Sequence, residues 1–231
     1  EVKISNKLSF SSTGIDIPGD ASHNLCLQAY QLIKDDYDIG PVNIHLHKEI
    51  PIGAGLGGGS ADASFMLKIL NDLFDLNITK NQLEDYARSL GSDCAFFIEN
   101  KPKYCVGKGD EFQPIDIDLS KYFILVINPN IHVSTQLAYS GVRPKPLSFD
   151  LKRKIKETNL EEFKLFLEND FEESVCRKFP VITEIKEKLY KKGCVYASMS
   201  GSGSTVFGIF ENKVDIEALF PSYWNHWINK I

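Results

Sequence analysis

A run of small residues at positions 51–61, PIGAGLGGGSA, is well suited by its composition to bind an anion. Five of the seven residues from Gly53 to Gly59 are glycine. Glycine adopts positive φ without strain and lets main-chain N–H groups approach an anion without interference from a Cβ atom. A helix predicted to begin at Ser60 would add its unpaired N–H groups and the positive end of its dipole. The pattern therefore predicts a phosphate-binding loop.

Two common phosphate motifs fit this loop poorly. Residues 53–58 match the dinucleotide fingerprint G-x-G-x-x-G, but that motif requires a parallel strand after its helix. Here the helix is followed by a second predicted helix at 79–90. A Walker A loop carries a lysine before the Ser or Thr that opens the helix, whereas this loop reads Gly59-Ser60. The remaining alternative is a flexible or tightly packed structural turn.

A second cluster of small residues, SMSGSGSTVFG, occupies positions 198–208. By itself it favours a hairpin turn between two strands. Because the chain also carries a predicted phosphate loop, Gly201 and Gly203 become candidates for a second turn that contacts the same triphosphate. The two alternatives remain open at this point.

Asp93, in the segment GSDCAFF, lies between the end of a predicted helix and a predicted apolar strand, Ala95–Ile98. A carboxylate at the edge of a hydrophobic core is costly unless its charge is used or paired. An N-cap or turn role and a catalytic role fit this position equally well. Asp62, in the first helical turn after the glycines, is expected to cap that helix, with a metal contact as the alternative.

His45 and His47 alternate on one predicted strand face, as two metal ligands would. No third ligand lies near them in sequence, so solvated strand histidines are the favoured interpretation. Ser60 is a weaker candidate for a metal ligand, because its hydroxyl lies beside the predicted phosphate site.

The elements that must position these residues follow from periodicity. A helix at 20–36 is expected behind a Ser22 cap, and Thr79 with Gln82 forms a capping box for the helix at 79–90. Charged amphipathic helices are expected at 148–155, 160–170 and 181–193, the last closed by Gly193. Strands are expected at 2–10, 11–17, 42–48, 94–99, 103–106, 123–128, 194–200 and 204–210.

A domain boundary is expected near the proline-containing segment 142–146, which gives two α+β halves, 1–142 and 143–231. The 231 residues are 43% hydrophobic, enough for one or two domains. A net charge of -5 argues against a nucleic-acid binder, and no apolar run is long enough for a membrane span. The scattered cysteines and the lack of a signal-peptide pattern favour a cytoplasmic protein.

Together, the three segments resemble the GHMP kinase superfamily. PIGAGLGGGSADA is similar to its ATP loop, and MSGSGSTVFG is similar to its C-terminal glycine motif. Within the superfamily, GAGLGGGSADA and GSDCAFF are most similar to the 4-diphosphocytidyl-2-C-methyl-D-erythritol kinase family. Homoserine and mevalonate-type kinases, or a non-catalytic nucleotide-binding module, are the alternatives. The similarity covers most of the chain and is weakest between about residues 145 and 190.

The resemblance implies a two-domain α+β fold, with a ribosomal-protein-S5-like nucleotide domain at 1–142 and a ferredoxin-like domain at 143–231. It implies transfer of the γ-phosphate of ATP, with Mg²⁺, to the 2-hydroxyl of a cytidine-diphosphate-linked methylerythritol in non-mevalonate isoprenoid biosynthesis. This small molecule is the expected partner, with neither nucleic acid nor membrane, and the sequence leaves the oligomeric state open.

By resemblance, Asp93 is the base that accepts the proton of the substrate hydroxyl. Thr135 falls where the family contacts the cytidine substrate, and residues 201–203 shape the phosphate end of the site. The ATP-site residues implied are Asn24, Leu25 and Lys48 for the adenine pocket, and Pro51, Gly53, Ala54, Gly55, Leu56, Gly57, Gly58, Gly59, Ser60 and Ala61 for the phosphates. Those implied at the substrate end are Thr135, Gly201, Ser202 and Gly203.

The family's first motif carries a lysine, an asparagine and a tyrosine–histidine pair, which find no match here. Lys3 and Lys7 lie in strand-like sequence of a different pattern. We therefore expect the chain to be incomplete at its N-terminus relative to the family. On that expectation the 231 residues alone would bind ATP weakly and turn over slowly.

Overall fold

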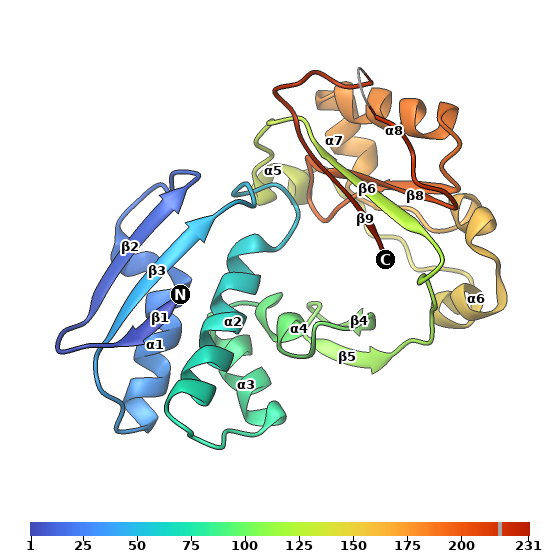
Figure 1. Cartoon of the computed structure of the whole chain (residues 1–231). Coiled ribbons are helices and arrows are strands. Elements are labelled where there is room, and N and C mark those ends of the chain that lie inside the picture. The colour runs from blue at the N-terminus through green and yellow to red at the C-terminus, as the bar shows by residue number, and fades with distance from the viewer. Residues whose placement is uncertain (217–218) are drawn as a thin grey trace. The chain divides into compact units, whose positions relative to one another are not determined.

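Two units, each with its own sheet and hydrophobic core, make up the protein in the computed structural model, which describes residues 1–216 and 219–231 (Figure 1). Unit 1 comprises Glu1–Ile52 and Gly57–Ile115, and unit 2 comprises Gly53–Leu56 and Asp116–Ile231. Both combine helices with strands, so the predicted two-domain α+β organisation is confirmed.

The boundary between the units differs from the expected one after residue 142. Unit 2 resumes at Asp116 because β6 (Phe123–Asn128) pairs with β8 (Val206–Phe210) and β9 (Asn225–Lys230). Because β6 lies between β8 and β9 in one sheet, it belongs to the same unit as these two strands. The proline-containing segment that follows β6 in sequence does not separate it from them. The segment 142–146 is therefore a connection within unit 2.

Unit 1 contains a mixed sheet with the strand order β1-β3-β2. The strands are β1 (Val2–Ile4), β2 (Ser9–Gly14) and β3 (Val42–Lys48). In β3, Val42 and Ile44 face the hydrophobic core, whereas His45 and His47 point to the opposite face. There His45 hydrogen-bonds with the Ser11 hydroxyl at 2.9 Å, as expected for a solvated polar sheet face.

The helices of unit 1 pack on one face of this sheet (Figure 1). They are α1 (Leu25–Asp36), α2 (Gly58–Leu73), α3 (Lys80–Leu90) and α4 (Cys94–Glu99), followed by the hairpin β4 (Lys103–Val106) and β5 (Glu111–Pro114). The predicted Thr79–Gln82 capping box is confirmed at the start of α3. The predicted Ser22 cap is wrong. Asn24 caps α1, because Ser22 lies within the short 3₁₀ turn Ala21–His23 that precedes the helix.

Residues 94–99 form helix α4 where a strand was expected. A short continuous apolar run does not distinguish a strand from a buried helix turn, because it has neither alternation nor helical spacing. In the structure Ala95 and Ile98, three positions apart, face the core formed with α2 and α3. Asn100 closes the helix in the left-handed region, at φ +52.

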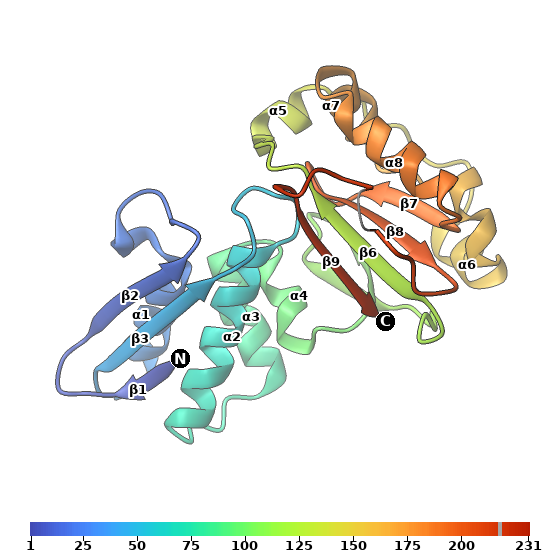
Figure 2. The same cartoon turned by 45° about the horizontal axis from the view of Figure 1, so that its top comes forward.

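In the described part of unit 2, four strands form an antiparallel sheet with the order β7-β8-β6-β9 (Figure 2). The remaining strand is β7 (Tyr196–Met199), which pairs with β8 as the sequence predicted. Side chains alternate between the two faces. Val206 and Phe210 pack with α7 and α8, whereas Ile209 packs with its cross-strand partner Tyr196 on the other face.

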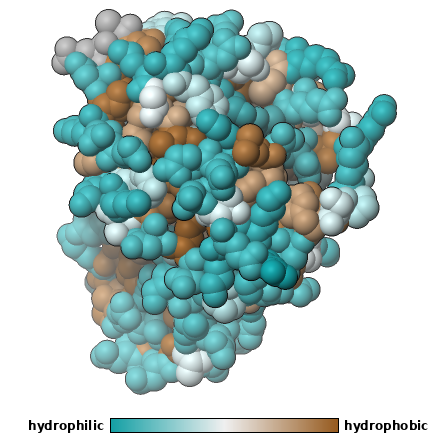
Figure 3. All heavy atoms as spheres, turned by 90° about the vertical axis from the view of Figure 1, so that its right-hand side faces the viewer, coloured by the Kyte–Doolittle hydropathy of each residue, from teal (hydrophilic) through white to brown (hydrophobic). Residues whose placement is uncertain are grey.

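The helices of unit 2 are α5 (Thr135–Ser140), α6 (Leu151–Glu157), α7 (Glu172–Lys178) and α8 (Val181–Lys191). The expected helix at 160–170 is instead a 3₁₀ helix, Leu160–Leu165, which buries Leu160 and Phe163. Gly193, at φ +88, follows α8 as predicted. In the part of the chain that is described, no helix is long and apolar enough to cross a membrane. The face drawn in Figure 3 is largely hydrophilic, with small separate apolar patches.

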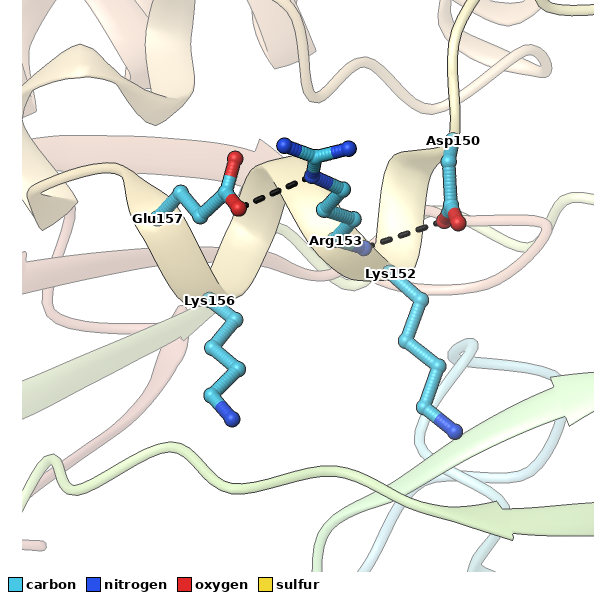
Figure 4. A pocket seen from close by; sticks show the side chains of 5 residues that line it. All are labelled: Asp150, Lys152, Arg153, Lys156 and Glu157. Atoms are coloured by element: carbon cyan, nitrogen blue, oxygen red, sulfur yellow. Dashed lines mark hydrogen bonds and ion pairs between the residues drawn. The ribbon is translucent and has the colours of Figure 1, made fainter.

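A shallow hollow of about 470 Å³ lies along α6, lined by charged side chains (Figure 4). Asp150 caps the helix by accepting a hydrogen bond from the Arg153 backbone N–H at 3.0 Å. The Arg153 guanidinium pairs with Glu157 at 2.8 Å, while Lys152 and Lys156 extend from the helix together. These are ordinary exposed helix-surface contacts, so the hollow is no candidate for the predicted chemistry.

Candidate functional site

The N-terminus of α2 carries the phosphate-binding features that the sequence predicted for unit 1. The helix begins at Gly58, two residues before the expected start, and its N-cap residue is Gly57 at φ +63. Gly57 has no side chain that could cap the first turn, and the first helical hydrogen bond runs from the Ala61 N–H to the Gly57 carbonyl at 2.9 Å. The preceding N–H groups and the positive helix end therefore suit an anion.

Close packing explains why glycine is required at this helix start. A Cβ atom at Gly57 would lie 2.9 Å from Cζ of Phe97 in α4. A Cβ atom at Gly58 would lie 2.8 Å from Cγ2 of Ile50 and 3.2 Å from Nζ of Lys48. The Lys48 ammonium therefore lies beside Gly58, the first residue of α2. A side chain at Gly57 or Gly58 would displace the backbone that carries the free N–H groups.

Lys48 at the end of β3 forms an ion pair with Asp62 of α2, at 2.5 Å. The expected capping role of Asp62 is therefore wrong. Its carboxylate is five residues past the N-cap and is held by a lysine whose side chain is only 4% exposed. A buried ammonium requires a charged partner more strongly than this half-buried helix start requires a side-chain cap.

The first half of the glycine loop, Gly53–Leu56, belongs to unit 2 and packs on the turn between β7 and β8. The Ser200 hydroxyl donates to the Gly55 carbonyl at 2.7 Å, and the Thr205 N–H donates to the Ala54 carbonyl at 3.2 Å. Gly55 has φ +77, and a Cβ atom there would lie 2.1 Å from the Ser200 carbonyl oxygen. The two glycine motifs, predicted separately, are thus in direct contact.

Buried polar side chains support this contact from within unit 2. The Asn128 amide donates to the Thr205 hydroxyl at 2.9 Å, and both residues are buried. The Ser204 hydroxyl, also buried, donates to the Ile131 carbonyl. Because unpaired polar groups in a core are costly, this network gives the turn one arrangement.

The glycine turn itself is short and hydrogen-bonded. The Ser200 N–H donates to the Thr205 carbonyl at 2.8 Å, and the Gly203 N–H donates to the Ser200 carbonyl at 3.0 Å. Gly201 and Gly203 both have positive φ, at +53 and +88. Gly201 is exposed, whereas Gly203 is buried against Met199. The predicted hairpin turn between two strands is therefore confirmed, and a phosphate contact at Gly201 and Gly203 stays a prediction.

Asp93 occupies the N-cap position of α4, yet its side chain makes no capping hydrogen bond. It is exposed, so the expected burial at a core edge is wrong, because residues 94–99 turn into a helix and leave Asp93 outside the packed face. The Ser92 hydroxyl donates to its carboxylate at 3.4 Å. Within the described structure, most of the acceptor capacity of this carboxylate thus stays available.

Cys94, next to Asp93, ties α4 to the start of α2. The Ser64 hydroxyl of α2 donates to the Cys94 carbonyl at 2.6 Å. Burial raises the pKa of the Cys94 thiol, although a hydrogen bond with the Ser60 hydroxyl acts to lower it. Asp93, next to Cys94 in sequence, therefore lies near Ser60 and the first turns of α2 within unit 1.

The other predicted site residues have structural roles of their own. The Asn24 side chain accepts a hydrogen bond from the Cys26 N–H at 2.9 Å and so caps α1. Leu25 lies near the loop, since a Cβ atom at Gly59 would be 3.9 Å from its Cδ1. Thr135 is exposed in the first turn of α5 in unit 2.

Within residues 1–216 and 219–231, no group of three or more His, Cys, Asp or Glu side chains is arranged to hold a metal ion. Mg²⁺ usually keeps several waters and takes one or two protein ligands together with phosphate oxygens. The oxygen donors of Ser60 and Asp93 match that preference.

Sequence reasoning missed several residues that shape this region. Ser200 and Thr205 flank the glycine turn, so their hydroxyl chemistry was a visible local signal. The sequence around Phe97 and Asn128 contains no such local signal, because the importance of these residues depends on contacts with distant segments.

Comparison with known proteins agrees with this geometry. Residues 24–101 match the GHMP kinases N terminal domain, and residues 151–225 match the GHMP kinases C terminal domain. The 4-diphosphocytidyl-2-C-methyl-D-erythritol kinase of Bacteroides fragilis is 47% identical over 219 residues, which are 93% of this chain and 80% of that protein. The enzyme of the same name from Cytophaga hutchinsonii is 52% identical, over 88% of this chain and 76% of that protein.

Solved structures give the same result. A crystal structure of 4-(cytidine 5'-diphospho)-2C-methyl-D-erythritol kinase superimposes with a TM-score of 0.72 at 31% identity, covering 90% of this chain and 75% of that chain. Homoserine kinase from Cytophaga hutchinsonii shares the fold, with a TM-score of 0.66 at 16% identity, covering 99% of this chain and 83% of that chain. The chain therefore belongs to the GHMP kinases, a family of ATP-dependent small-molecule kinases.

Proposed function

We propose that this kinase transfers the γ-phosphate of ATP to the 2-hydroxyl of 4-diphosphocytidyl-2-C-methyl-D-erythritol, a step of non-mevalonate isoprenoid biosynthesis. The observation that carries the proposal is the 47–52% identity, over about nine-tenths of the chain, to enzymes named for that substrate. Homoserine and mevalonate kinases share the fold at 15–16% identity, which supports no substrate assignment.

The uncapped start of α2 supports a role in holding the transferred phosphates. Phosphoryl transfer depends chiefly on positioning and on neutralising charge, which free backbone N–H groups and a helix N-terminus supply. Residues 51–61 would bind the triphosphate, with Gly201, Ser202 and Gly203 contributing at the substrate end. Asn24, Leu25 and Lys48 would contribute to the adenine site. The Lys48 ammonium lies next to Gly58 and is ion-paired with Asp62, so it helps to hold the first turns of α2 in place.

Asp93 is the proposed general base. Its carboxylate is exposed, makes no capping hydrogen bond and lies in the same unit as the start of α2. A base of this kind accepts the proton of the attacking hydroxyl, which lowers the barrier to phosphoryl transfer. Thr135, exposed at the start of α5, is proposed to contact the cytidine substrate.

Mg²⁺ is proposed to accompany the ATP and to neutralise charge on its phosphates. The Ser60 hydroxyl is the side-chain oxygen nearest the proposed phosphate site in sequence. We assign the activity to the cytoplasm, where the five free thiols of this chain would remain reduced.

An acceptor assay tests the proposed function. Protein expressed from its native reading frame would be incubated with Mg²⁺-ATP and each of three acceptors: the cytidine-diphosphate-linked methylerythritol, homoserine and mevalonate. We expect ADP release and a phosphorylated product with the first acceptor alone. Phosphorylation of homoserine or mevalonate would instead assign another GHMP activity. ATP binding without transfer to any of the three would favour a non-catalytic nucleotide-binding module.

A further inference from the structure

Asn169, just before α7, connects that helix to the glycine turn of unit 2. Its side-chain amide nitrogen donates to the Met199 carbonyl and to the Gly201 carbonyl, each at 2.8 Å. Its amide oxygen accepts a hydrogen bond from the Phe171 N–H at 3.0 Å. One side chain therefore spans the end of β7, the glycine turn and the start of α7.

The orientation of this amide follows from its neighbours. The Phe171 N–H is a donor and requires the oxygen, so the nitrogen must face the two carbonyls. Both hydrogens of the nitrogen are then used, and no other side chain of similar size supplies two donors and one acceptor in this geometry. Asn169 is thus specific for its position.

Glu172, three residues after Asn169, also forms hydrogen bonds to the C-terminal end of β7. One carboxylate oxygen accepts hydrogen bonds from the Met199 N–H at 2.6 Å and from the Ser198 hydroxyl at 3.0 Å. The other oxygen is ion-paired with Lys186 of α8. Glu172 hydrogen-bonds to β7, whereas Asn169 reaches past the strand to the turn residue Gly201.

The turn transmits this constraint to the phosphate loop. Ser200, between Met199 and Gly201, donates its hydroxyl to the Gly55 carbonyl at 2.7 Å. Gly201 is also close to Gly55, since a Cβ atom at Gly201 would lie 3.2 Å from the Gly55 carbonyl oxygen. Asn169, the turn and residues 53–56 all belong to unit 2, so the whole path lies within one unit.

We propose that Asn169 is a positioning residue for ATP: its amide fixes the β7–β8 turn, and through Ser200 it fixes Gly55 of the phosphate loop. The proposal rests on the ATP-dependent activity proposed above. It concerns the nucleotide side of the reaction and is independent of the identity of the acceptor. Asn169 itself touches no reacting atom.

The decisive variant is Asn169→Asp. It keeps the oxygen that accepts from the Phe171 N–H, so the start of α7 is retained, but it replaces both donors with a carboxylate oxygen facing two carbonyls. Asn169 lines a groove of about 1550 Å³, so water can hydrate the new charge and the variant is expected to fold. Asn169→Ser is the second variant, because a hydroxyl can cap the Phe171 N–H without introducing charge.

Binding of a non-hydrolysable ATP analogue would be measured by calorimetry without acceptor, on protein from its native reading frame. We expect both variants to raise the dissociation constant about tenfold, the equivalent of losing one or two hydrogen bonds. In steady-state assays the KM for ATP should rise, with the KM for the acceptor unchanged. A merely structural role would lower the melting temperature without this selective change.

Asn71→Asp is the matched control. The Asn71 side chain also hydrogen-bonds to the backbone, donating to the Ile78 carbonyl at 3.3 Å and accepting from the Ile78 N–H at 2.9 Å. It lies in unit 1, at the end of α2 opposite the glycine loop. The substitution should reduce the stability of the protein and leave ATP binding unchanged. Ser200→Ala should weaken binding as the Asn169 variants do, and combining it with Asn169→Asp should add little further.

Three outcomes would overturn the proposal. Folded Asn169 variants with wild-type affinity would show that the turn needs no such support. Additive effects of Asn169→Asp and Ser200→Ala would show that Asn169 acts by another route. Failure of the unaltered protein to bind the analogue would overturn the proposed kinase function as well, which separates that failure from the other two.

Discussion

Lys48 at the end of β3 and Asp62 in the second turn of α2 form a 2.5 Å ion pair whose lysine side chain is only 4% exposed, against 27% for the aspartate. The pair links the central strand of the unit 1 sheet to the helix whose N-terminus is the proposed phosphate site. An ammonium this deeply buried is tolerated only because the carboxylate neutralises it.

Replacing Asp62 with Asn should therefore destabilise the protein strongly. The substitution leaves Lys48 buried without a charged partner, which costs roughly 2–4 kcal/mol when the exposure of the aspartate is taken into account. Urea unfolding would measure the loss. The control is Glu157→Gln, which breaks the exposed pair with Arg153 on α6 and should cost less than about 0.5 kcal/mol. Equal losses in the two variants would contradict the importance given to burial.

Gly55→Ala should disrupt the contact between the loop and the β7–β8 turn. The new Cβ atom would lie 2.1 Å from the Ser200 carbonyl oxygen, at a backbone φ of +77 that alanine disfavours. We expect ATP affinity to fall more than about tenfold as Ser200 is displaced. Gly40→Ala is the control, since a Cβ atom there meets nothing within 4 Å. Nucleotide titration of both variants checks the prediction, and unchanged affinity in Gly55→Ala would refute it.

Asp93→Asn should reduce kcat by about 10²–10⁴, the usual contribution of a general base, while the affinity for ATP stays within about twofold. The exposed position makes a large change in stability unexpected. Asp85→Asn in the same unit removes a surface partner of Arg88 and should leave kcat unchanged. Single-turnover measurements with saturating ATP would separate the chemical step from binding. A kcat within twofold of the unaltered enzyme would exclude Asp93 as the base.

Stability should decline above about pH 9 because of buried thiols. Burial raises the pKa of Cys26 to about 12, with the negative charge of Asp62 adding to the effect, and burial raises the pKa of Cys194 to about 12. Both pKa values are above that of an unfolded thiol, about 8.5. The stabilising contribution is therefore complete below that pH and is lost as the pH rises towards 12.

A variant with Cys26→Ala and Cys194→Ala should show a shallower fall of melting temperature between about pH 8.5 and 10.5. Under native conditions a thiol reagent should modify the exposed Cys105 before either of these buried residues. Identical pH profiles for the unaltered protein and the double variant would show that other groups govern the alkaline loss.

Local sequence patterns predicted the elements whose signals are complete within a few residues. The Thr79–Gln82 capping box, the alternation of residues 42–48 and the closing Gly193 each specify a local conformation, and the structure has all three. The helix at 94–99 was mistaken for a strand, because its six residues lack periodicity and its form depends on packing against α2 and α3.

The roles of single charged residues were harder to predict. Asp62 was expected in the first helical turn, where it could cap the helix, yet it pairs with Lys48, 14 residues earlier. Asp93 precedes an apolar run, yet the helical turn leaves it in solvent. In both cases the partner or the exposure is set by another segment, which a pattern along the chain does not contain.

Composition and spacing alone predicted a glycine-rich loop at the start of a helix, and the structure has that loop at the N-terminus of α2, because backbone freedom and helix polarity are local properties. Only the tertiary structure decided that Gly55 of this loop contacts Ser200, 145 residues away. The hydrogen bond from Asn169 to Gly201, the residue after Ser200, is likewise visible only in the structure. The physical reason is that β7, β8 and α7 pack around one hydrophobic core, and the turn that this core positions meets the loop through backbone contacts. Hydrogen bonds between segments so far apart follow from that packing and leave no periodic trace in the sequence.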